Sequence, residues 1–79
     1  MTLSEAFTKR LRHYLKEKNI TVYEFAKNNG FKQNALSDML FNKDNSIALE
    51  NVCKVCKPLN ITIKEFFDCE DFNLENLDF

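Results

Sequence analysis

The middle of the chain carries four short polar side chains at helical spacing: Gln33, Asn34, Ser37 and Asp38. Apolar residues alternate with them along the same stretch, so the four polar groups are expected to face outward from a helix. Amides and hydroxyls donate and accept hydrogen bonds without a long charged stem. Hydrogen bonding of this kind recognises the edges of base pairs in a DNA groove.

Two short helices at residues 22–29 and 33–41 are predicted to position this set, joined at Gly30, the only glycine of the chain. Thr21 and Glu24 have the spacing of a capping box, which begins the first helix. Gly30 accepts the left-handed backbone conformation that ends a helix. Two helices joined by so short a turn are typical of a helix-turn-helix, whose second helix enters the major groove.

Three further helices are predicted, at residues 5–18, at 48–58 and from residue 63 to 67, two of them preceded by capping-box pairs. The chain has one glycine and one proline in 79 residues, which leaves little room for β-turns. The expected fold class is therefore all-α, a compact five-helix bundle. The expected division is a helix-turn-helix domain over residues 1–68 and an acidic C-terminal tail over residues 69–79.

The net charge of −1 hides a division of charge along the chain. Residues 1–64 carry 11 basic and 6 acidic side chains, whereas residues 65–79 carry 6 acidic side chains and no basic one. A basic body suits contact with DNA phosphates. The basic residues of the first helix form either a phosphate-contacting face or an ordinary solubilising surface: Lys9, Arg10, Arg12, Lys16 and Lys18.

The acidic tail has three open interpretations. It is a frayed solubilising end, an arm whose apolar residues pack on the body or on a second subunit, or a competitor that covers the basic surface. Its four apolar residues favour packing over fraying, because a disordered segment seldom needs them.

Several classes of function are disfavoured by composition. Three cysteines are an odd number without a disulfide spacing pattern, which is typical of a reducing cytoplasm. No run approaches the roughly 18 apolar residues of a membrane span. Zinc needs four ligands, so Cys53 and Cys56 are expected to fill core volume instead. Neither a metal, a cofactor, a small-molecule substrate nor an enzymatic activity is expected.

With these features the chain resembles the phage-repressor and Cro-type helix-turn-helix family, also called Xre-like. The resemblance spans residues 5–68 and rests on an ordered set of residues: Ile20-Thr21, Phe25-Ala26, Gly30, Gln33, Leu36-Ser37, Leu49, Val52, Val55-Cys56, Leu59-Asn60-Ile61-Thr62 and Glu65-Phe66-Phe67. It implies a five-helix bundle of the phage-repressor-like type and a homodimer on inverted repeats of double-stranded DNA. It also implies regulation of transcription, as a repressor of phage or mobile-element type.

The resemblance and the local charge assign expected roles to individual residues. The base-reading residues are expected to be Gln33, Asn34, Ser37 and Asp38. The phosphate-contacting residues are expected to be Thr21, Lys27, Lys32, Asn42 and Lys43.

Some positions depart from the family pattern. Val22 stands where a glutamine is common, and Asp38 stands where a basic residue is frequent, although an acid there could accept from a cytosine amine. Leu15 and Leu40 replace an arginine–glutamate pair, and such a joint replacement maintains a fold.

Asp38, Val22 and the acidic tail favour an alternative function: an antitoxin-like protein-interaction module with weak or lost DNA binding.

Overall fold

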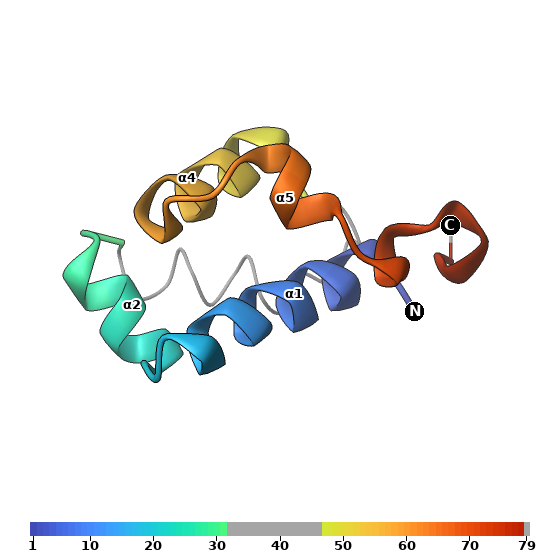
Figure 1. Cartoon of the computed structure of the whole chain (residues 1–79). Coiled ribbons are helices and arrows are strands. Elements are labelled where there is room, and N and C mark those ends of the chain that lie inside the picture. Colours follow the sequence, from blue (N-terminus) through green and yellow to red (C-terminus); the bar gives the residue numbers. More distant parts are fainter. Residues whose placement is uncertain (32–46, 79) are drawn as a thin grey trace.

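The chain folds into a succession of short helices in a computed structural model, which describes residues 1–31 and 47–78 (Figure 1). The elements are α1 (Leu3–Glu17), α2 (Val22–Asn28), α4 (Leu49–Leu59), α5 (Ile63–Phe67) and the 3-10 turns η1 (Glu70–Phe72) and η2 (Leu74–Asn76). These ranges contain no strand, only an isolated parallel bridge between Thr2 and Asp78. The all-α class is thus confirmed for the described residues. The predicted helix at 33–41, and with it the count of five helices, lies outside them.

Threonine side chains begin α1, α2 and α5. At α1 the predicted capping box is complete, because Thr2 Oγ1 accepts the Glu5 N–H at 3.1 Å and the Glu5 carboxylate accepts the Thr2 N–H at 3.0 Å. The same reciprocal pair begins α5. At α2 the Thr21 hydroxyl accepts the Glu24 N–H at 3.0 Å, but the Glu24 carboxylate accepts the hydroxyl hydrogen of Thr21 instead of its backbone N–H. The capping box predicted at α2 is therefore only half formed.

The ends of α1, α2 and α4 share one backbone motif. Each helix is followed by a residue with positive φ, at 56°, 70° and 58° in chain order: Asn19, Gly30 and Asn60. The next residue donates its N–H to a carbonyl of the last helical turn at 3.0–3.2 Å, as in a Schellman motif. That residue is apolar and packs against the core in all three cases: Ile20, Phe31 and Ile61. Each change of chain direction is thereby fixed by backbone bonds and by an apolar contact.

The core lies between α1, α2, α4 and α5 and is centred on Phe66. Its buried members are Phe7, Leu11, Leu15, Phe25, Ala26, Val52, Val55, Cys56, Leu59 and Phe66. The Phe66 ring is fully buried and lies 5.4 Å from Phe7, 5.5 Å from Phe67 and 6.0 Å from Phe72 between ring centroids. Residues of α1, α5 and η1 therefore meet at one aromatic side chain, and α1 is far from the other two elements in sequence.

The two cysteines of α4 have different environments. Cys56 is buried in the core, and this burial raises the pKa of its thiol. Cys53 is exposed, so the expectation that both cysteines fill core volume is wrong for Cys53. It follows the buried Val52 by one residue, and a helix turns by about 100° per residue, which directs Cys53 away from the core. All three cysteines of the chain are free.

The tail packs against the beginning of the chain. Asp78 donates its backbone N–H to the Met1 carbonyl at 2.9 Å, Leu77 is buried, and Asp71 lies 3.5 Å from the Lys9 ammonium. Figure 1 shows this tail and the N-terminus at one end of α1 and α2 at the other end. These contacts favour the interpretation of the tail as an arm that packs on the body.

The turn after α2 provides a stability test. A Cβ added at Gly30 would meet no atom within 4 Å, so the constraint at φ 70° is conformational and not steric. Gly30→Ala is expected to lower the free energy of unfolding by about 1 kcal/mol, measured by urea titration. Gly30→Asn is the control, because asparagine tolerates this conformation. Equal losses in both variants would contradict this account.

The capping box of α1 predicts a pH dependence. The backbone N–H of Thr2 and then its hydroxyl hold the pKa of the Glu5 carboxyl below its ordinary value of 4.5. A pKa lowered by folding stabilises the fold above pH 4.5, and this contribution is lost as the pH falls through the lowered value. The stability difference between the wild-type chain and Glu5→Gln should therefore narrow on acidification.

Urea unfolding between about pH 6 and pH 3 measures this difference. Glu75→Gln is the control, because the Glu75 side chain has no hydrogen bond or ion pair with another described residue. A Glu5→Gln difference that stays constant over this range would show that the carboxylate charge does not stabilise α1.

Candidate nucleic-acid interface

Two of the predicted site residues belong to α2 and its cap. Thr21 is exposed and caps the N-terminus of α2, and Lys27 is exposed in the last turn of the same helix. Lys27 forms no ion pair with any described acidic side chain. The remaining predicted residues lie outside the described residues: Lys32, Gln33, Asn34, Ser37, Asp38, Asn42 and Lys43.

The turn that follows α2 determines where the chain leaves this helix. Gly30 has φ 70°, and Phe31 then donates its N–H to the Ala26 carbonyl at 3.0 Å. The Phe31 ring stacks on Phe25 with 5.8 Å between centroids. Asn29 also donates its side-chain amide to the Phe25 carbonyl at 2.8 Å. Backbone and ring contacts therefore hold Phe31 against the end of α2.

A hollow of about 430 Å³ lies where α1 meets the start of α2. Its apolar lining consists of Leu15, Ile20 and Val22, and its polar lining consists of Arg12, Lys16, Asn19 and Thr21. All four polar residues are exposed, whereas Leu15 is buried. Thr21 therefore lies beside two cationic side chains, which composition alone did not single out from the other basic residues of α1.

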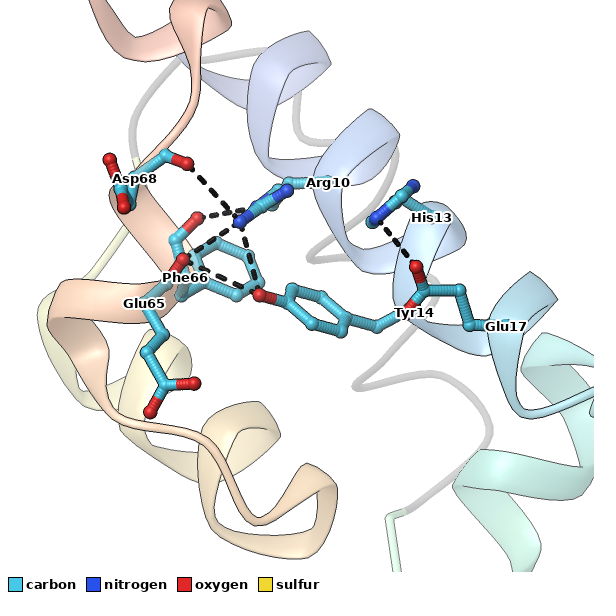
Figure 2. A network of polar contacts seen from close by, with 7 residues as sticks. All are labelled: Arg10, His13, Tyr14, Glu17, Glu65, Phe66 and Asp68. Carbon is cyan, nitrogen blue, oxygen red and sulfur yellow. Dashed lines mark hydrogen bonds and ion pairs between the residues drawn. The ribbon is translucent and has the colours of Figure 1, made fainter.

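Arg10 has a structural role that the sequence did not reveal (Figure 2). Its Nε donates to the Phe66 carbonyl at 2.7 Å, and its Nη2 donates to the Glu65 carbonyl at 2.8 Å and to the Tyr14 hydroxyl at 3.0 Å. The guanidinium carbon lies 4.8 Å from the centroid of the Tyr14 ring. Because helix C-termini carry unpaired carbonyls and partial negative charge, Arg10 stabilises the end of α5.

Other basic side chains near the same face also have partners. Lys9 pairs with Asp71 at 3.5 Å, and His13 lies 3.2 Å from the Glu17 carboxylate. Lys9 and Arg10 therefore bind within the chain, a role that neither interpretation of the basic residues of α1 included.

The described residues contain no group of three or more histidine, cysteine or acidic side chains arranged to hold a metal ion. None of the described helices has both the length and the apolarity needed to cross a membrane.

The described helices, the cap of α2 and the glycine turn agree with the first helix and the turn of a helix-turn-helix, a class of DNA-binding domain. Residues 10–71 match the Cro/C1-type HTH DNA-binding domain, so the chain belongs to this family. The match confirms the resemblance to the phage-repressor and Xre-like proteins.

One solved structure shows the same fold. The chain is similar to a structure described as the crystal structure of the prophage Lp1 protein 11, with a TM-score of 0.77 and 24% sequence identity. The alignment covers 89% of this chain and 92% of that chain. No curated protein matches the sequence. At this identity the structural similarity establishes the fold, and the family match carries the assignment to DNA-binding domains.

The bonds of Arg10 predict a specific loss of stability. Arg10→Gln removes charged donors from two carbonyls of α5 and should lower the free energy of unfolding by about 2 kcal/mol in urea titration. Arg12→Gln is the matched control on the same helix, since Arg12 is exposed and has no acidic partner among the described residues. The control should change stability by less than about 0.5 kcal/mol. Similar losses in the two variants would refute the role of Arg10.

Proposed function

We propose that the protein is a homodimeric, sequence-specific DNA-binding regulator of transcription that acts in the cytoplasm as a repressor of phage or mobile-element type. The observation that carries this proposal is the family match over residues 10–71, which spans both predicted helices of the motif. The capped start of α2 and its fixed exit at Gly30 support it. In a helix-turn-helix the first helix must hold the second at a set angle.

In this proposal residues 33–41 of each subunit occupy the major groove. The base-reading residues are Gln33, Asn34, Ser37 and Asp38. An amide side chain can make two hydrogen bonds to adenine, and a carboxylate can accept a hydrogen bond from the cytosine amine. The two subunits contact half-sites about 34 Å apart, because one turn of DNA separates equivalent positions in the groove.

The remaining proposed contacts fix the position of the protein on the DNA backbone. They are made by Thr21, Lys27, Lys32, Asn42 and Lys43. The exposure of Thr21 and Lys27 supports this role for the two described members of the set. Phosphate contacts of this kind set register and orientation but carry no sequence information directly.

Gln33→Ala tests base reading. The preferred site is first obtained by selecting bound duplexes from a random library with the wild-type chain. The variant should then bind that site about 1–3 kcal/mol more weakly and lose preference at one base pair, because one amide contact with a base is gone. Affinities for single-base variants of the site measure both effects.

Asn73→Ala is the control for this experiment, since Asn73 is an exposed tail residue and its substitution should change neither affinity nor preference. If Gln33→Ala weakens binding to every sequence equally, Gln33 does not read a base. If the wild-type chain selects no sequence, a protein-interaction role replaces the proposed function.

A further inference from the structure

We propose that Arg12 and Lys16 of α1 form a second phosphate-binding element, which contacts the DNA backbone beside Thr21. The inference rests on the proposed function and deepens it, because it assigns DNA contacts to α1, outside the helix-turn-helix motif. The ligand is the phosphodiester backbone of double-stranded DNA.

Several other charged side chains of α1 already have partners within the chain. Lys9 pairs with Asp71, Arg10 donates to the carbonyls of α5, and His13 lies against Glu17. Arg12 and Lys16 form no ion pair with any described acidic side chain. Within the part of the chain that the structure describes, no acidic side chain therefore neutralises either cation.

The positions of Arg12 and Lys16 allow both cations to contact one anion. They are four residues apart on α1, so they lie on the same side of the helix, and both line the hollow of about 430 Å³ at the α1–α2 junction. Thr21, already proposed as a phosphate contact, lines the same hollow. An anion at this junction would meet two positive charges, beside a threonine whose hydroxyl donates to the Glu24 carboxylate at 3.2 Å.

The lining of the hollow itself contains no acidic residue, although the lining residue Thr21 donates its hydroxyl hydrogen to the Glu24 carboxylate at 3.2 Å. The other lining residues are apolar or carry an amide, and none is acidic: Leu15, Asn19, Ile20 and Val22. A concave surface lined by one sign of charge concentrates its electric field and raises the local concentration of counter-ions. The junction is thus electrostatically suited to a phosphate.

The acidic tail does not neutralise this site. The tail packs at the opposite end of α1, as Figure 1 shows, and α1 has 15 residues. A helix of that length extends for about 22 Å. Charges on exposed groups are largely screened beyond about 8 Å at physiological salt. The acidic side chains of the tail are therefore too far away to neutralise Arg12 and Lys16.

The double variant Arg12→Gln/Lys16→Gln tests the inference. The probe is a labelled random-sequence duplex of about 30 base pairs, and its affinity is measured by fluorescence anisotropy across about 50–200 mM salt. Each lost phosphate contact lowers the slope of log K against log salt by about 0.9. The double variant should therefore have a slope smaller by about two units and bind more weakly at the lowest salt.

Two further variants serve as controls. Lys57→Gln/Lys64→Gln removes the same number of charges from exposed residues of α4 and α5 that do not line the hollow, and it should keep the wild-type slope. Arg12→Lys/Lys16→Arg retains both charges and should keep it as well. Thermal unfolding checks that all variants are folded.

A wild-type slope in Arg12→Gln/Lys16→Gln would overturn the inference and leave the proposed function intact. An equal fall in slope in Lys57→Gln/Lys64→Gln would also overturn it, because the effect would then follow net charge and not position. A wild-type chain that binds no duplex at any salt would overturn the proposed function and this inference together.

Discussion

The junction between α1 and α5 holds the described parts of the domain together. With five residues, α5 is too short to be stable alone, so its stability depends on tertiary contacts. Phe66 is fully buried against rings from α1 and η1, and Arg10 binds the carbonyls at the end of the same helix. Without this junction α4 would lose its contact with α5. The tail would lose the aromatic ring of Phe66, on which Phe72 packs.

The charged side chains of α1 fall into two groups. Toward its N-terminal half α1 binds α5 and the tail through Arg10 and Lys9. Toward its C-terminal end lie two cations, Arg12 and Lys16, that line a hollow with Thr21 and have no ion-pair partner among the described residues. The tail thus packs where it completes the fold, and it lies far from the start of α2 (Figure 1). This arrangement explains how a chain with net charge −1 can offer a basic surface to DNA.

Local signals were predictable from the sequence, and long-range ones were not. The caps at Thr2 and Gly30 depend on residues within one turn, so they could be identified directly. The left-handed residues Asn19 and Asn60 were missed, because asparagine adopts many conformations. Arg10 donates to the carbonyls of two residues that lie 55 and 56 positions further along the chain, and no local sequence pattern indicates these bonds. The base-reading set could be predicted only from residue types and the family resemblance.

The most direct test of the central claim is the ratio of affinities for selected and random DNA. Duplexes are selected from a random library with the purified chain, and both affinities are then measured at the same salt concentration. The account predicts an inverted repeat with half-sites about 34 Å apart, bound at least about 10³-fold more tightly than random DNA. Equal affinity for all duplexes, or no binding near physiological salt, would contradict it.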